Sequence, residues 1–224
     1  MLPRFAAELR YATQVSNPDS VLLALLAYRM EAISIGHLAL RHHMSWEEAP
    51  TMEVYFNGKQ VIEGKATGFT NAAIESAIIH CRAILEFLGL QSSKASATEV
   101  AERSVRARAD DLGVEQFAGL SMLSKAKAIA AYPGERAEAE AALALIFHSA
   151  NKGLAHATAS FKLHSGDARL LEIAFRGVPA LLINGFYSPL GIIPHAINSL
   201  SAQEPVAGSR QSIEACAFSA LNND

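Results

Sequence analysis

The stretch DSVLLALLAYRMEAISIGHLALRHH, residues 19–43, decides the fold class. Its apolar residues recur at alternating spacings of four and three, the repeat of a helix that packs one face against its neighbours. The residues of this repeat are Val21, Leu25, Tyr28, Ala32, Ile35 and Ala39. Because further apolar residues flank the repeat, we expect a largely buried helix. Pro18 and Asp19 supply the chemistry typical of a helix start.

Other segments of the chain predict further helices. Residues 70–90 repeat the same spacing and have Gly89 near their end, and the apolar positions are Ile74, Ile78, Cys81, Leu85 and Leu88. Residues 135–164 begin with an Ala-rich and Glu-rich turn, which favours a long helix with an apolar stripe. Residues 96–109 and 168–176 also look helical, and we expect Arg103 to be exposed in the first of them.

A β-hairpin is predicted between the first two helices, over about residues 52–63. Two short segments of strand-forming residues flank Asn57-Gly58, and both residues tolerate the positive φ that a type I′ turn requires. The sequence therefore predicts a mainly α protein, an up-down helical bundle with a small β-hairpin insertion. We expect one domain over residues 1–200 and a C-terminal tail over residues 201–224.

Composition excludes several classes of protein. Half of the 224 residues are hydrophobic, so the chain has enough apolar material for a core, and a net charge of −3 argues against a strongly basic DNA-binding module. The two cysteines, Cys81 and Cys216, are far apart and form no CxxC pair, which is typical of a reducing cytoplasm. The longest apolar run is too short to cross a bilayer. We expect a cytoplasmic protein that does not associate with membranes.

The sequence contains no established catalytic or phosphate-binding motif, and no Glu-x-x-His pair that would place two metal ligands on one helix face. We therefore expect neither a metal nor a cofactor. The most suggestive polar group is on the helix predicted over residues 135–164, where His148, Lys152 and His156 recur every four residues. A histidine beside a cation serves as an acid, a base or a phosphate ligand. The alternative is a solvated helix face on which histidines happen to fall.

Two segments carry a family resemblance. Residues 78–90, IIHCRAILEFLGL, and residues 151–158, NKGLAHAT, resemble HEPN domains (higher eukaryotes and prokaryotes nucleotide-binding). The resemblance implies a bundle of four or five helices that is commonly a homodimer. Active members of the family are metal-independent ribonucleases whose signature is an Arg followed after four to six residues by a His. His156 matches that His, but the positions of the Arg hold Asn151, Ala150 and Ser149.

The missing Arg makes a non-catalytic HEPN-like bundle the leading hypothesis, one that self-associates or binds a partner protein, a nucleotide or RNA. A second hypothesis is a weak ribonuclease that uses His156, with Asn151 and Lys152 holding phosphate across a dimer cleft. In that chemistry an Arg stabilises phosphate charge and a His promotes attack by the 2′-hydroxyl. A third hypothesis is a small-ligand sensor with a pocket near Tyr28, His80 and Phe87.

Overall fold

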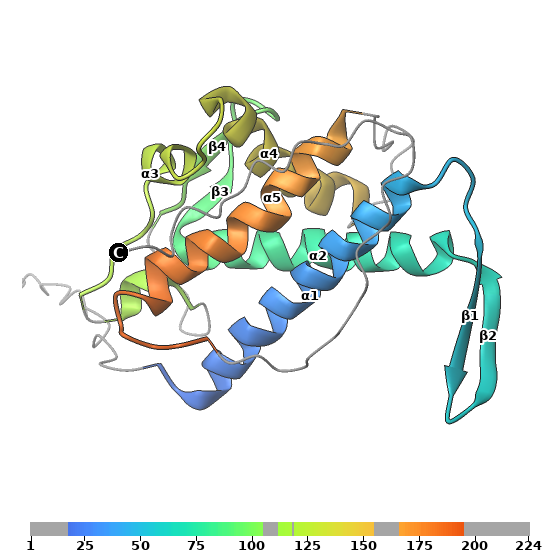
Figure 1. Cartoon of the computed structure of the whole chain (residues 1–224). Coiled ribbons are helices and arrows are strands. Elements are labelled where there is room, and N and C mark those ends of the chain that lie inside the picture. The colour runs from blue at the N-terminus through green and yellow to red at the C-terminus, as the bar shows by residue number, and fades with distance from the viewer. Residues whose placement is uncertain (1–17, 105–111, 118, 155–165, 195–224) are drawn as a thin grey trace, which may run out of the picture.

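The computed structural model describes residues 18–104, 112–117, 119–154 and 166–194. Five α-helices make up most of it, together with two small antiparallel sheets (Figure 1). The helices are α1 (Ser20–Ser45), α2 (Thr67–Leu88), α3 (Lys125–Ala130), α4 (Arg136–His148) and α5 (Asp167–Leu182). The strands are β1 (Thr51–Phe56), β2 (Lys59–Lys65), β3 (Leu90–Ser92) and β4 (Val100–Glu102). The predicted class, mainly α with a β-hairpin insertion, is confirmed.

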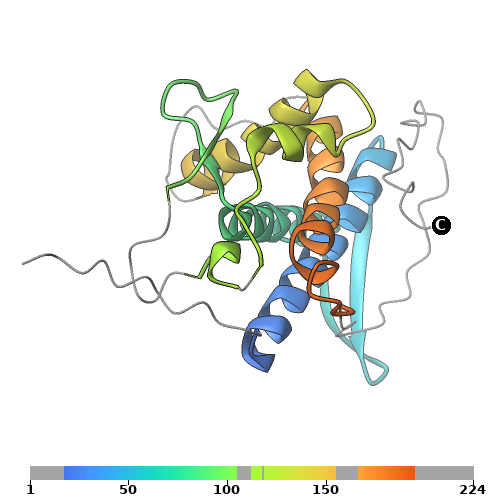
Figure 2. The same ribbon diagram turned by 90° about the vertical axis from the view of Figure 1, so that its left-hand side faces the viewer.

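The helices α1, α2, α4 and α5 all contribute to the main core, and α4 packs beside α5 on the far side of α2 from the N-terminal half of α1 (Figures 1 and 2). The start of α1 is as predicted, because the Asp19 carboxylate caps it by accepting a hydrogen bond of 2.7 Å from the backbone N–H of Leu22. The helices α1 and α2 approach each other closely at Gly36, where a Cβ would lie 2.3 Å from the Cβ of Ala77. Only glycine permits this contact.

The helix α2 follows its predicted pattern closely. All five residues of its predicted apolar face are buried, namely Ile74, Ile78, Cys81, Leu85 and Leu88. Gly89 ends the helix with a φ of 108°, in the left-handed region that favours glycine.

The first helix buries a different face from the one that its repeat predicts. Val21 is 75% exposed, Leu25 41% and Tyr28 52%, whereas the neighbouring Leu22 and Leu26 are buried. The expectation of a largely buried helix is therefore wrong for its N-terminal half. The apolar surface of α1 is wider than the area that α2 and α5 cover.

The predicted hairpin forms between β1 and β2, with Asn57 and Gly58 at φ values of 52° and 77°. It extends away from the helices, beside the end of α1 and the start of α2 (Figure 1). A register shift between Val54 and Tyr55 interrupts its ladder.

Residues 96–109 were predicted as a helix, and for the described residues 96–104 this is wrong. The second small sheet forms instead, since β3 pairs with β4 through Leu90, which is opposite Glu102. Arg103 is buried rather than exposed. Its guanidinium donates to the carbonyl of Glu86 at 2.8 Å and to the Glu115 carboxylate at 2.7 Å, which attaches this segment to the end of α2.

The α-helix predicted over residues 135–164 ends at His148, earlier than expected. After α4 the chain continues as a π-helix, η2 (Ser149–Leu154), and residues 155–165 lie outside the description. The helix α5 is longer than predicted, because it continues through Pro179 and into a second π-helix, η3 (Ile183–Tyr187).

An aromatic cluster closes the end of the core at η3. The ring of Phe186 is fully buried, and its centroid lies 5.2 to 5.3 Å from the ring centroids of Phe87, Phe117 and Tyr187, with edge-to-face geometry in each pair.

Two described helical segments, Ser20–Ser45 and Asp167–Tyr187, are long and apolar enough to span a membrane by length and composition alone. Core helices of soluble proteins pass the same test, and half of the second segment's apolar window is buried in this fold.

Candidate functional site

The structure brings together Tyr28 and Arg29 of α1 with His80 of α2. One guanidinium nitrogen of Arg29 lies 3.2 Å from Nδ1 of His80, although the two residues are 51 positions apart in the sequence. The ring of Tyr28 meets the imidazole edge-to-face at a centroid distance of 5.2 Å. We call these three residues the Arg29 cluster.

The position of each side chain follows from the packing of its helix. Tyr28 and Arg29 lie on the side of α1 beside α2, next to Leu26 and Ala27, which enter the core. His80 lies between the exposed Ile79 and the fully buried Cys81, at the border of the core. Arg29 and His80 are therefore half-buried, and the aliphatic part of the arginine is in an apolar environment.

The electrostatics of the cluster are unusual because it holds a cation without a carboxylate. Burial lowers the pKa of the Arg29 guanidinium, and Tyr28 opposes this shift. Burial also lowers the pKa of His80, and the nearby positive charge of Arg29 lowers it further. His80 is therefore neutral near pH 7, and its Nδ1 accepts the hydrogen bond from Arg29. Among the described residues, no carboxylate pairs with Arg29 within 4.0 Å.

Other arginines among the described residues have acidic partners. Arg82 contacts Glu86 at 3.0 Å, Arg103 contacts Glu115 at 2.7 Å, and Arg169 contacts Glu138. Within the described part of the chain, Arg29 is paired with a neutral imidazole alone, so it loses hydration without gaining a counter-charge there. This arrangement is suited to binding an anion, which would supply the missing charge.

A second charged cluster connects α1 and α5, and it is already compensated. Glu172 of α5 lies 3.6 Å from Nε2 of His37 and 4.0 Å from the guanidinium of Arg176. The contact with His37 lowers the pKa of Glu172, burial opposes the shift, and the charges of Arg176 and Arg41 lower it further. This cluster stabilises the contact between the two helices.

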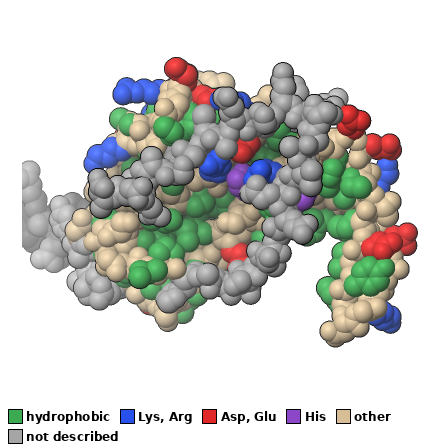
Figure 3. Space-filling model, viewed as in Figure 1, with side chains coloured by type: hydrophobic (Ala, Val, Ile, Leu, Met, Phe, Trp, Pro, Cys, Tyr) green, Lys and Arg blue, Asp and Glu red, His purple; other side chains and the backbone are tan. Residues whose placement is uncertain are grey.

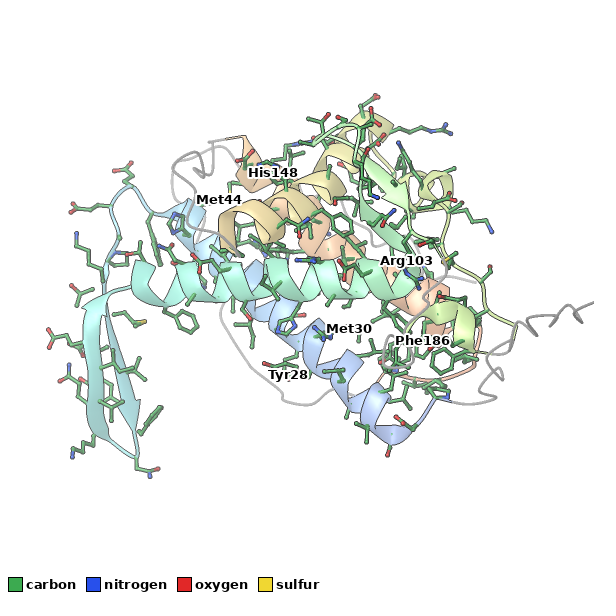
Figure 4. The ribbon with its side chains drawn as sticks, turned by 180° about the vertical axis from the view of Figure 1, so that it is seen from behind. Tyr28, Met30, Met44, Arg103, His148 and Phe186 are labelled. Carbon is green, nitrogen blue, oxygen red and sulfur yellow. The ribbon has the colours of Figure 1, made fainter. Side chains whose placement is uncertain are left out.

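The residues predicted from the histidine repeat and the HEPN-like motif do not form a described site. His156 lies outside the described residues, so the structure does not test its predicted role. Asn151 is half-buried in η2, and Lys152 belongs to the same π-helix. In Figure 4, His148 and Tyr28 lie on opposite sides of α2, so this segment is separate from the Arg29 cluster.

The structure places the three residues of the predicted sensor pocket in two ring clusters, and the pocket itself stays a prediction. Tyr28 and His80 are in contact, whereas Phe87 belongs to the aromatic cluster around Phe186. Sequence reasoning did not single out Arg29. A signal was present, since Arg29 is the only Lys or Arg between residues 11 and 40 and interrupts an otherwise apolar run.

Comparison with known proteins adds no relative: no protein-family model, no curated protein and no solved structure matches this chain. The HEPN-like resemblance therefore stays a prediction. Within the described ranges, no group of three or more His, Cys, Asp or Glu side chains is placed to hold a metal ion.

Proposed function

We propose that this chain is a non-catalytic, HEPN-like helical bundle that binds a nucleotide through the Arg29 cluster. The observation that carries the proposal is the half-buried guanidinium of Arg29, whose described polar partner is the neutral His80 at 3.2 Å. A phosphate placed against this guanidinium would gain two parallel charge-assisted hydrogen bonds. It would also neutralise a charge for which the described residues supply no carboxylate.

The neighbouring aromatic ring narrows the class of anion. Tyr28 is 52% exposed beside Arg29, so part of its ring is available to a ligand. Stacking of a base on an aromatic side chain contributes about 1–3 kcal/mol and tolerates any base. One guanidinium and one ring match a ligand that has one phosphate and one base. A nucleoside monophosphate is therefore the class that we expect to bind.

The state of His80 supports binding rather than acid–base catalysis. A general base needs a free lone pair, and the lone pair of His80 Nδ1 is used by the hydrogen bond from Arg29. The lowered pKa of His80 also reduces its tendency to take up a proton. Its other ring nitrogen then carries the hydrogen and is available to donate to a ligand.

The test is isothermal titration calorimetry of the full chain with AMP, with adenosine and inorganic phosphate as the two partial ligands. We expect AMP to bind more tightly than either of them. Replacing Arg29→Met should weaken AMP binding by at least about tenfold, because a hydrogen bond to a charged group contributes about 1.5–3 kcal/mol. The matched control is Arg82→Met, which removes an arginine from α2 that is already paired with Glu86.

A second readout separates a binding role from a structural one. If Arg29 is kept for a ligand, Arg29→Met should leave the ligand-free protein as stable as the wild type or more stable, since a methionine has no charge to desolvate. Absence of AMP binding to the wild type, or equal binding by both methionine variants, would remove the proposal. A clear loss of stability in Arg29→Met would assign the residue to the fold instead.

A further inference from the structure

The hairpin has one apolar face that nothing in the described chain covers at its outer end. Residues paired directly across an antiparallel ladder project to the same face, so Val54 and Ile62 lie together, and Met52 and Phe56 lie on that face by alternation. Phe56 is 65% exposed and Ile62 51%. We call Met52, Val54, Phe56 and Ile62 the hairpin face.

The opposite face of the hairpin is more polar, although Tyr55 on that face is 53% exposed and Val61, which the register shift leaves unpaired, is 44% exposed. It carries the Glu53–Glu63 and Thr51–Lys65 pairs, and the Tyr55 hydroxyl donates to the Glu53 carboxylate at 2.7 Å. The two faces of the hairpin thus differ in polarity, and a two-stranded hairpin is only marginally stable when its apolar side chains meet water. Figure 3 shows hydrophobic side chains on this projecting arm, away from the helices.

A second uncovered apolar surface lies on the N-terminal half of α1. Val21, Leu25 and Tyr28 are spaced by four and three residues, so they form one line along the helix, which we call the exposed α1 stripe. Their exposed fractions are 75%, 41% and 52%. The hairpin and this half of α1 reach to the same side of α2, as Figures 1 and 2 both show.

We infer that a second copy of this chain covers both surfaces, with the hairpin face of each copy packed on the exposed α1 stripe of the other. A two-fold axis makes the two contacts identical, so the assembly closes as a dimer. The inference shares Tyr28 with the nucleotide proposal but uses neither Arg29 nor His80, and its tests substitute Val21 and Ile62 and need no nucleotide, so either proposal can fail without the other.

The exposed area favours this reciprocal arrangement. From the exposed fractions of its side chains, each surface offers about 300 Å² of apolar area, if a whole aromatic side chain accounts for about 200 Å². One surface meeting its own copy would bury about 600 Å² in total, which is within the range of incidental packing contacts. Both surfaces used twice bury about 1,200 Å², which is where specific interfaces begin.

The first test is sedimentation velocity of the full chain between 1 and 100 µM. The wild type should form dimers in this range, and Val21→Glu and Ile62→Glu should each raise the dimer dissociation constant at least tenfold. Tyr55→Glu is the matched control, because it puts the same charge on the polar face of the same hairpin. Circular dichroism melts check that each variant is folded.

The second test mixes the Val21→Glu and Ile62→Glu chains. In a reciprocal dimer each variant alone damages both contacts, whereas the mixed dimer keeps one contact intact and concentrates both substitutions in the other. We expect the mixture to dimerise more strongly than either variant by itself. A mixture that associates no better than its components overturns the reciprocal arrangement. A wild type that is monomeric at 100 µM overturns the whole inference, whether another protein or residues 195–224 of the same chain cover the two surfaces.

Discussion

The contact between α1 and α2 gives the sharpest test of the fold, through the substitution Gly36→Ala. The added Cβ would lie 2.3 Å from the Cβ of Ala77 and 2.7 Å from the backbone oxygen of Ala73. Carbon atoms pack best at about 3.5–4.0 Å, so the two helices would have to separate by about 1 Å. Neither contacting atom can rotate away, because one belongs to the backbone and the other is a Cβ.

The magnitude follows from two opposing effects. Overpacking a tight contact costs about 1–3 kcal/mol. Alanine is favoured over glycine inside a helix by about 0.5–1 kcal/mol. Since the clash involves atoms that cannot move independently, we expect a net loss of about 1–2 kcal/mol in the free energy of unfolding. For a chain of this length that corresponds to a fall in Tm of about 3–6 °C.

The assay is urea unfolding followed by circular dichroism at one fixed protein concentration. The matched control is Gly68→Ala, also in α2, where a Cβ would meet nothing within 4 Å. The control should keep or slightly raise the stability, by at most about 0.5–1 kcal/mol. If Gly36→Ala is as stable as Gly68→Ala, the close approach of α1 to α2 at Gly36 is refuted.

Three further predictions concern other parts of the fold. Arg103→Met should cost about 1.5–3 kcal/mol in urea unfolding, because it removes the guanidinium hydrogen bonds to the Glu86 carbonyl at 2.8 Å and to the Glu115 carboxylate at 2.7 Å; a loss below about 1 kcal/mol would contradict this structural role. The lowered pKa of His80 means that the unfolded chain binds the proton more readily, so stability should fall as the pH is lowered below the ordinary value of 6.5. His80→Gln should reduce this loss of stability between pH 7 and 5. If the free energy of unfolding falls equally with pH in both proteins, His80 is not its cause. Phe186→Ala should lower the stability by about 3–5 kcal/mol in thermal or urea unfolding, since the ring is fully buried among three others; a change below about 1 kcal/mol would place the ring outside the core.

Local signals in the sequence were enough to predict several elements. Asp19 caps α1, Asn57-Gly58 turns the hairpin and Gly89 ends α2, and the structure confirms all three. Each of these signals acts within a few residues, through a side-chain hydrogen bond or through a positive φ that few residue types adopt. The buried face of α2 was also predictable, because its apolar residues occupy a single face.

The failures share a different physical cause. The residues around Arg103 resemble an exposed helix when taken alone, and the arginine is buried only because Glu115 and the end of α2 supply its partners. The apolar surface of α1 extends around most of the helix, so its repeat could not say which part faces the core. The glycine at position 36 decides that, since it brings one side of α1 against Ala77.

The sequence by itself therefore determined the class of the fold, the hairpin and the limits of the first helices, because short-range hydrogen bonds and backbone preferences specify them. Only the tertiary structure decided that Arg29 meets His80 with no carboxylate among the described residues, and that the side chains of the hairpin face and the exposed α1 stripe are exposed. The reason is that burial and pairing of a side chain depend on residues distant in the chain. In this protein the partners of Arg29 and Arg103 come from other elements, and no local sequence pattern predicts them.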